Sequence, residues 1–146
     1  MYDIRLRLEP FAAERAALHR TDRELADMRA AVNAMRDELD NSEPFNLADS
    51  RFHSLVASAS RSSVLRSTLD RLSELALLTR TVVAPSERSR RGALTDVERI
   101  LMAIERQHPK RSANAMERHI ANVRDDYLEM VVNGGIAVGD AKRASG

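Results

Sequence analysis

Apolar residues recur along this chain at intervals of three and four positions, which is the period of an amphipathic α-helix. Two segments show the spacing most clearly, one with Leu65, Leu69, Leu72 and Ala76, the other with Val97, Ile100, Leu101 and Ile104. No segment alternates apolar and polar residues in the manner of a β-strand. The pattern therefore predicts an all-α protein, and short connections between helices favour an antiparallel bundle.

Capping and helix-breaking residues divide the chain into six predicted helices. They cover about residues 3–19, 21–39, 46–60, 62–84, 93–107 and 109–132. Thr21, followed three residues later by Glu24, forms the pattern of a capping box at the start of the second helix. Either Ser62 or Ser63 caps the fourth helix, and Pro109 suits the first turn of the sixth.

The remaining segments are predicted to be irregular. Residues 40–44 form a connection, and residues 85–92 form a polar, arginine-rich loop that we expect to be mobile. Ala93 or Thr95 then begins the fifth helix. Residues 133–135 (Asn-Gly-Gly) end the sixth helix, and the tail 133–146 is expected to be disordered because it is rich in small residues and has no periodicity.

Composition excludes several classes of protein. The 146 residues suit one domain, and the absence of cysteine excludes disulfides and thiolate metal sites. No apolar run is long enough to cross a membrane, and the charged N-terminus is unlike a signal peptide, so we expect a cytoplasmic protein. The chain has 23 basic against 22 acidic residues and only 3% aromatics. It therefore lacks the excess of positive charge and the aromatic side chains with which proteins usually bind DNA directly.

The third predicted helix carries polar residues beside its apolar side. Asp49 and His53 are four residues apart and therefore lie on one side of a helix, next to Phe52 and Val56. A carboxylate and an imidazole so placed can bind a divalent metal, or they can form a hydrogen bond with each other. The pair alone does not decide between these two interpretations.

Two further polar residues adjoin apolar positions. His119 lies between Met116 and Ile120 in the sixth predicted helix, where a histidine bonded to a backbone carbonyl is the simpler expectation. Arg5 lies among apolar residues near the start of the chain, and its default expectation is a solvated side chain.

Three parts of the sequence together resemble the FCD domain, the effector-binding C-terminal domain of FadR-type GntR transcription regulators. They are YDIRLRLEPFAA at residues 2–13, LADSRFHSLV at residues 47–56 with its Asp-x-x-Phe-His pattern, and ILMAI at 100–104 followed by AMERH at 115–119. The resemblance covers about residues 2–130. It implies an antiparallel helical bundle that encloses a polar cavity.

In the metal-binding branch of that family, one aspartate and three histidines hold a divalent ion. The resemblance assigns the aspartate to Asp49 and two histidines to His53 and His119, with zinc, nickel or manganese as the ion. The third histidine position is occupied here by Val97, which cannot bind a metal. A three-ligand site, completed by water or effector, would bind more weakly; alternatively, this member has lost the metal.

The two acidic neighbours of Val97 are poor substitutes for the lost histidine. Asp96 and Glu98 each point about 100° away from it around a helix. They could replace the missing ligand only if the helix shifts.

The family's effectors are often small carboxylates. The resemblance implies that Arg5 binds the carboxylate, since a guanidinium can pair with both of its oxygens. Arg80 and Asn122 are further candidates because of their positions on the helices. The loss of one histidine predicts a more apolar pocket than is usual.

These features predict an effector-sensing domain at residues 1–132 of a bacterial GntR/FadR-type regulator, without catalytic activity. A winged helix-turn-helix domain, absent from this chain, is expected to precede it and to bind the DNA, and the sensor is expected to form a homodimer. Two alternatives stay open: a helical protein-interaction domain without ligand, and a metal-dependent hydrolase or lyase that uses the same three residues.

Overall fold

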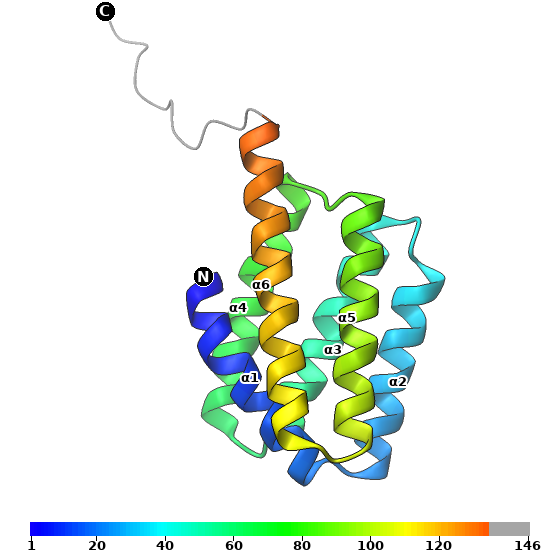
Figure 1. Ribbon diagram of the computed structural model, residues 1–146, viewed down its shortest axis with the longest axis vertical. Helices are drawn as coiled ribbons and strands as arrows, with labels where there is room; N and C mark the ends of the chain where they lie inside the picture. Colours follow the sequence, from blue (N-terminus) through cyan, green and yellow to red (C-terminus); the bar gives the residue numbers. More distant parts are fainter. Residues whose placement is uncertain (135–146) are drawn as a thin grey trace, which may run out of the picture.

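The computed structural model describes residues 1–134, and the regular elements of this part are all α-helices (Figure 1). They are α1 (Tyr2–His19), α2 (Asp22–Asp37), α3 (Ser42–Ala59), α4 (Ser63–Val82), α5 (Glu87–Glu105) and α6 (Pro109–Asn133). The all-α class and the six helices are thus confirmed. The predicted disordered tail lies, from residue 135 onward, outside the described residues.

The helices run alternately up and down and form one antiparallel bundle (Figure 1). Consecutive helices α2 and α3, α3 and α4, and α5 and α6 pack against each other, as short connections require. The first helix also packs along the last, so that α1 and α6 close the bundle. Because α1 contacts α3, α4 and α5 as well, its side chains reach the centre of the molecule.

The helix caps that the sequence predicts are present. The Thr21 hydroxyl accepts a hydrogen bond from the Glu24 backbone N–H at 3.1 Å, and the Glu24 carboxylate accepts one from the Thr21 N–H at 2.8 Å. At the start of α4 the cap is Ser62 rather than Ser63, since the Ser62 hydroxyl accepts from the Leu65 N–H at 3.2 Å. These bonds satisfy N–H groups that have no partner inside the helix.

Two predicted connections are wrong, because helices begin earlier than expected. α3 begins at Ser42 and includes Pro44, which the first turn of a helix tolerates since its N–H needs no partner there. α5 begins at Glu87, capped by the Ser86 hydroxyl, so most of the predicted 85–92 loop is helical. Arg90 holds this segment in place by donating to the carbonyls of Leu39 and Pro85, each at 2.7 Å.

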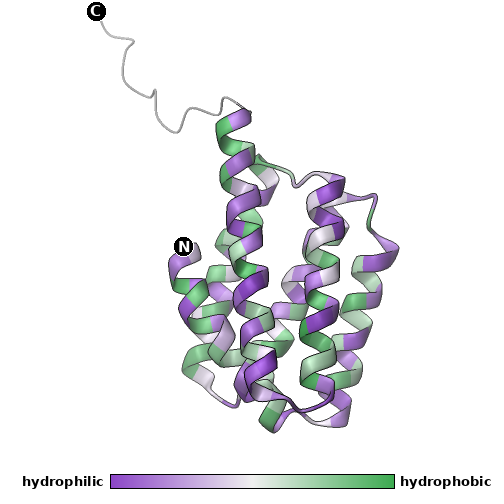
Figure 2. Ribbon diagram, viewed as in Figure 1, coloured by the Kyte–Doolittle hydropathy of each residue, from purple (hydrophilic) through white to green (hydrophobic). Residues whose placement is uncertain are grey.

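Helices α2 to α6 each bury an apolar side, whereas α1 buries alanines and charged residues and leaves Ile4, Phe11 and Leu18 half exposed. Figure 2 shows apolar and polar residues alternating around the ribbons. The large side chains at the centre of the core come from α2, α3, α5 and α6 and include Met28, Met35, Phe45, Phe52, Val56, Ile100, Ile104, Met116 and Ile120. Several charged or polar side chains are equally buried among them, namely Arg5, Glu9, Asp49, His53 and His119. A buried charge is costly unless it is paired, so this group needs a specific explanation.

Candidate metal and effector site

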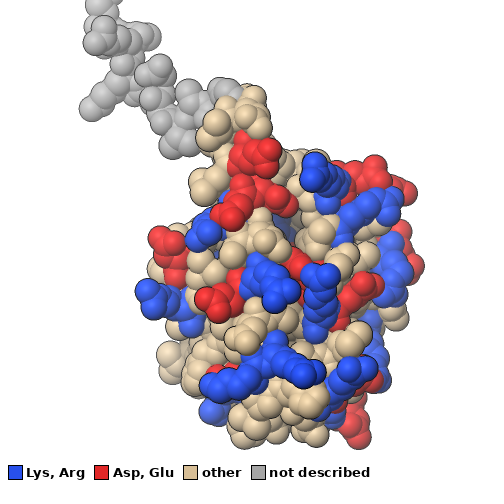
Figure 3. Space-filling model, viewed as in Figure 1, with Lys and Arg blue, Asp and Glu red and all other residues tan. Residues whose placement is uncertain are grey.

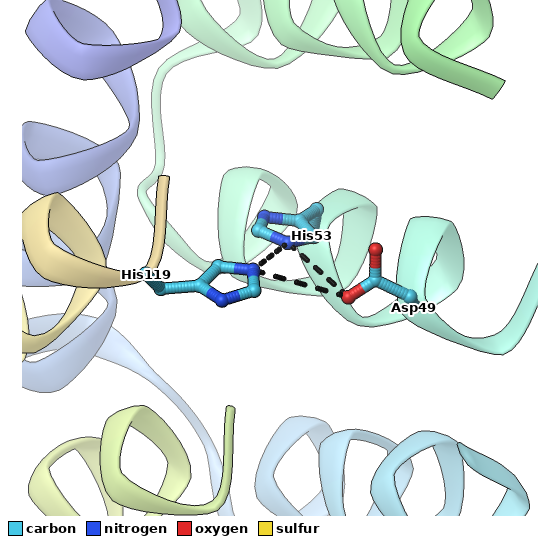
Figure 4. Close-up of side chains that lie close together, drawn as sticks. All are labelled: Asp49, His53 and His119. Atoms are coloured by element: carbon cyan, nitrogen blue, oxygen red, sulfur yellow. Dashed lines mark hydrogen bonds and ion pairs between the residues drawn. The ribbon is translucent and has the colours of Figure 1, made fainter. Parts of the chain in front are cut away.

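The three predicted metal ligands meet at the centre of the bundle (Figure 4). Asp49 and His53 project from successive turns of α3, and His119 reaches them from α6. The Nε2 atoms of His53 and His119 are 3.2 Å apart. Asp49 Oδ1 lies 3.5 Å from Nε2 of His53 and 4.0 Å from Nε2 of His119. The sequence-based hypothesis that these residues form one group is therefore supported by their geometry.

The donor set and its spacing suit a divalent ion. Zinc bound tetrahedrally at about 2.0–2.1 Å places its ligand atoms about 3.3 Å apart. Two of the three separations here, 3.2 and 3.5 Å, are close to this value, and the third is 4.0 Å. The buried Asp49 Oδ1 has no hydrogen-bond partner among the described residues. An unpartnered carboxylate oxygen in the core is costly, and a cation would satisfy it. Asp49, His53 and His119 could thus hold a metal ion.

A carboxylate that sequence reasoning missed lies behind His53. Glu9, fully inside the bundle on α1, accepts a hydrogen bond from Nδ1 of His53 through one oxygen. Its other oxygen accepts one from Nε of Arg5 at 2.5 Å. A sequence signal existed: Arg5 and Glu9 are four residues apart on the side of α1 that also carries its buried alanines.

Asp96 lies behind the other histidine. Its Oδ2 is 3.9 Å from Nδ1 of His119 and accepts a hydrogen bond from Asn122 at 2.8 Å. It therefore lies on the side of the ring opposite the nitrogen that faces Asp49. Glu98 binds Arg36 at 2.7 Å on the exposed side of α5. Neither acid replaces the missing histidine as a ligand.

An apolar side chain occupies the position at which the family resemblance implies a third histidine. Val97 is fully buried on α5 and belongs to the same apolar core as Ile100 and Ile104. The ion would accordingly have three protein ligands, with the remaining coordination positions left to water or an effector.

The buried charges shift one another's ionisation. Burial alone would raise the pKa of Glu9, but Arg5 and then His53 lower it to about 2. Burial would likewise raise the pKa of Asp49, yet Arg80 and His53 hold it well below its ordinary value. Both acids are therefore carboxylates at neutral pH.

The pKa values of the two histidines shift in opposite directions. Burial opposes the charged form of His53, but Glu9 and then Asp49 outweigh it and raise its pKa to about 9. Burial lowers the pKa of His119, which is consequently a neutral imidazole and is already suited to bind a metal.

The three predicted effector residues border this centre, and each is engaged by an internal carboxylate. Arg5 binds Glu9, Asn122 binds Asp96, and Arg80 donates from α4 to Asp49 Oδ2 at 2.5 Å. Arg80 leaves Asp49 Oδ1 free to face the histidines. Of the three, Arg80 is the one that lines a cavity next to Asp49.

That cavity of about 30 Å³ adjoins a large groove at the end of the bundle. The lining of the cavity combines apolar or aromatic residues with polar and charged ones of both signs; the polar and charged ones are Asn46, Asp49, Arg80, Ser89, Arg90 and Asp126. The groove, of about 1090 Å³, lies between the end of α4, the start of α5 and the C-terminal half of α6. The two share six lining residues, namely Val83, Ser89, Ala93, Val123, Asp126 and Met130. The groove thus leads from the surface toward Asp49.

The fold and this centre define a class of protein: a six-helix bundle that surrounds a buried carboxylate–imidazole group reached from one end. The model of the FCD domain matches residues 1–122 of the chain. The chain therefore belongs to the FCD domain family. No curated protein sequence matches it significantly.

Solved structures of GntR-type regulators have the same fold. Streptococcus agalactiae GntR is 28% identical over 85% of this chain and 56% of that chain, with a TM-score of 0.75. E. coli McbR/YncC is 14% identical over 87% of this chain and 62% of that chain, with a TM-score of 0.74, and this likeness concerns the fold alone. The chain thus spans less than two thirds of the length of either protein.

Among the described residues, none of the helices combines the length and the apolar character needed to cross a membrane.

Proposed function

We propose that this chain is the sensor domain of a bacterial GntR-type transcription regulator and that it binds a small carboxylate at a divalent metal held by Asp49, His53 and His119. The observation that carries the proposal is the convergence of three buried ligand atoms, one of them an unpartnered carboxylate oxygen, in an FCD domain. A bound zinc, nickel or manganese ion would supply a Lewis acid to which a carboxylate can coordinate.

The charges of the centre favour an anionic effector. Glu9, Asp49 and Asp96 carry three negative charges, and Arg5 and Arg80 carry two positive ones. With neutral histidines and a divalent ion, these five side chains and the metal together carry a net charge of about +1. A monocarboxylate would neutralise it, and buried charge is least costly when it is balanced.

Arg80 is the residue best placed to recognise that carboxylate. It comes from α4 at the rim of the cavity and reaches Asp49, so the carboxylate end of an effector that lies in the groove can contact both the metal and the guanidinium. Asn46, whose buried Oδ1 has no partner among the described residues, can accept a hydrogen bond from a hydroxyl group of a hydroxycarboxylate. Asn122 lines the groove outside, and Arg5 supports the site through Glu9.

The same contacts favour binding over catalysis. Glu9, Asp49 and Asp96 each pair with a basic or amide side chain, and the pKa of each carboxyl is lowered, which makes all three weak general bases. The groove of about 1090 Å³ that leads to this centre, in turn, favours a domain that binds a ligand over an interaction domain without one.

We further propose that the domain acts on DNA through a separate winged helix-turn-helix domain and works in the bacterial cytoplasm. The face shown in Figure 3 carries basic and acidic side chains interspersed, rather than the basic surface that phosphates require. Effector binding would shift the balance between two arrangements of the paired DNA-binding domains, by no more than its difference in affinity for them.

A second copy of this chain is the proposed partner of α1 and α4, which pack together at one side of the bundle. α1 leaves Ile4, Phe11 and Leu18 half exposed at intervals of seven residues, which places them in one stripe. α4 exposes Leu75, Leu78 and Val82 at intervals of three and four. Apolar stripes on neighbouring helices are typical of a dimer interface.

A thermal-shift screen of small carboxylates tests the proposed sensing. We expect the zinc-loaded protein to be stabilised by at least one mono- or hydroxycarboxylate, and this stabilisation to be lost in Arg80→Met. The exposed Arg88→Met is the matched control, since Arg88 lines the groove away from Asp49. Uncharged amides of the same acids, if they stabilised the protein equally, would contradict a carboxylate effector.

A further inference from the structure

Each histidine of the centre has two ring nitrogens, and only one of them can face the metal position. In His53 that nitrogen is Nε2, which points to Asp49 and His119, while Nδ1 points to Glu9 on α1. A neutral imidazole carries its hydrogen on one nitrogen and its lone pair on the other. The acceptor opposite Nδ1 therefore determines whether Nε2 has a lone pair to offer.

Glu9 is itself held in a fixed orientation. One of its oxygens accepts from Arg5 Nε at 2.5 Å and the other accepts from His53. Arg5 is only 1% exposed and Glu9 only 3%, so solvent does not compete for these bonds. Arg5, Glu9 and His53 thus form a connected chain of side chains from α1 to α3.

We propose that Glu9, held by Arg5, is a positioning residue for metal binding: it accepts the Nδ1 hydrogen of His53 and so directs the lone pair of Nε2 at the ion. This inference rests on the proposed function, because it concerns the same metal. It gives Arg5 a supporting role in place of direct effector contact. It also makes α1, which contributes no ligand, part of the metal site.

The second histidine provides an internal comparison. Asp96 lies behind His119 as Glu9 lies behind His53, but at 3.9 Å its oxygen is beyond hydrogen-bond distance of Nδ1. The Asp96 carboxylate also accepts hydrogen bonds from Asn122 and Arg99. Its influence on the metal should consequently be smaller than that of Glu9.

The test measures the zinc dissociation constant of the metal-stripped chain by competition with a chromophoric chelator. Glu9→Gln removes the charge but keeps an acceptor, whereas the double variant Arg5→Met/Glu9→Met removes the ion pair without changing the net charge. The double variant also avoids a buried unpaired arginine, so it protects against failure to fold. Asp96→Asn is the matched control, and circular dichroism in the presence of chelator verifies folding.

We expect the double variant to bind zinc about 10–100-fold more weakly, the usual effect of losing a carboxylate behind a metal-bound histidine. Glu9→Gln should lose less zinc affinity than the double variant, because its amide oxygen can still accept the Nδ1 hydrogen. Asp96→Asn should lose the least zinc affinity of the three. In nitrogen-15-edited proton spectra of the zinc-loaded proteins, the Nδ1 hydrogen of His53 should resonate further downfield in the wild type and in Asp96→Asn than in Glu9→Gln, because a carboxylate is a stronger acceptor than an amide oxygen. A merely structural role of Glu9 would not produce this difference.

Unchanged zinc affinity in a folded double variant would overturn the positioning role while leaving the metal site intact. A wild-type protein that binds none of zinc, nickel and manganese would instead refute the proposed function, so the two failures are distinguishable. Equal losses in the double variant and in Asp96→Asn would also overturn the role assigned to Glu9, since they would show no dependence on the hydrogen bond to His53.

Discussion

Position 97 is the residue at which this chain departs from the ligand pattern that its family resemblance implies. Val97 is fully buried on α5, next to the acid that lies behind His119. Replacing it by histidine should add the fourth ligand and tighten zinc binding by about tenfold or more, which corresponds to about 1.4 kcal/mol. Without metal the larger side chain should reduce stability, because the core is already filled.

Calorimetric titration of the metal-stripped proteins measures this effect. Val97→Ala serves as the control, since it disturbs the same position without supplying a ligand, and it should not bind zinc more tightly than the wild type. If Val97→His binds no more tightly than the wild type, position 97 does not face the ion.

Protonation of His53 gives the metal-free protein a specific pH dependence. His53 faces Glu9 on α1, Asp49 on its own helix and His119 on α6, and its pKa is about 9 against an ordinary 6.5. Because the folded state holds the His53 proton more tightly than the unfolded state, protonation of His53 adds to the free energy of unfolding. This contribution is fully present below pH 6.5 and is lost as the pH rises through 9. We expect this loss to reach up to about 3 kcal/mol.

Urea unfolding at about pH 6 and about pH 9, with chelator present, checks this expectation. The stability difference between wild type and His53→Gln should shrink as the pH rises. His108→Gln, in the turn before α6, should show no such change. A difference that stays constant between the two pH values would show that His53 is not protonated in the metal-free fold.

At the level of single residues, the sequence predicted which side chains meet but not how they are paired. Asp49 and His53 follow from helical spacing, and His119 follows from the family resemblance. Glu9 was missed because local patterns do not show that α1 crosses behind α3. Only the packing of these helices brings the Glu9 carboxylate, 44 positions away in sequence, to Nδ1 of His53.

Among the helices, α5 is the one whose start the sequence misplaced by the most residues. Five arginine, serine and glycine residues before Ala93 suggested a loop, yet Gly92 lies inside the helix and the Ser86 cap begins it. The helix forms because Arg90 is anchored to two carbonyls from other segments, which a local pattern cannot reveal. By contrast, the cap at Thr21 was predictable because all of its partners are local.

Gly92→Ala tests this helix start. A methyl group at this position would meet no other atom within 4 Å, and glycine in a helix interior is unfavourable relative to alanine. The substitution should therefore stabilise the protein by about 0.5–1 kcal/mol, as measured by urea unfolding. Gly134→Ala, beyond the end of α6, should give no comparable gain. A destabilised Gly92→Ala would indicate that residues 87–92 are not helical.

For the whole molecule, the exposed stripes of α1 and α4 predict a dimer. Phe11→Glu combined with Leu78→Glu places a charge in each stripe and should convert the dimer to a monomer, because burying an unpaired carboxylate is costly. Light scattering across the micromolar range measures the mass. Met102→Glu, an equally exposed apolar position on α5, is the control and should leave the dimer intact. A monomeric wild type would contradict the proposed interface.

The proposed function depends on whether the buried centre binds a metal. Calorimetric titration of the metal-stripped chain measures this most directly. We predict that zinc, nickel or manganese binds with a stoichiometry of one ion per chain, since Asp49, His53 and His119 form a single group. Binding should weaken strongly in His119→Ala, which removes the ligand from α6, and should persist in His108→Ala. If none of the three metals binds the folded wild-type chain at micromolar concentration, Asp49, His53 and His119 are a hydrogen-bonded polar cluster and the proposed metal site is wrong.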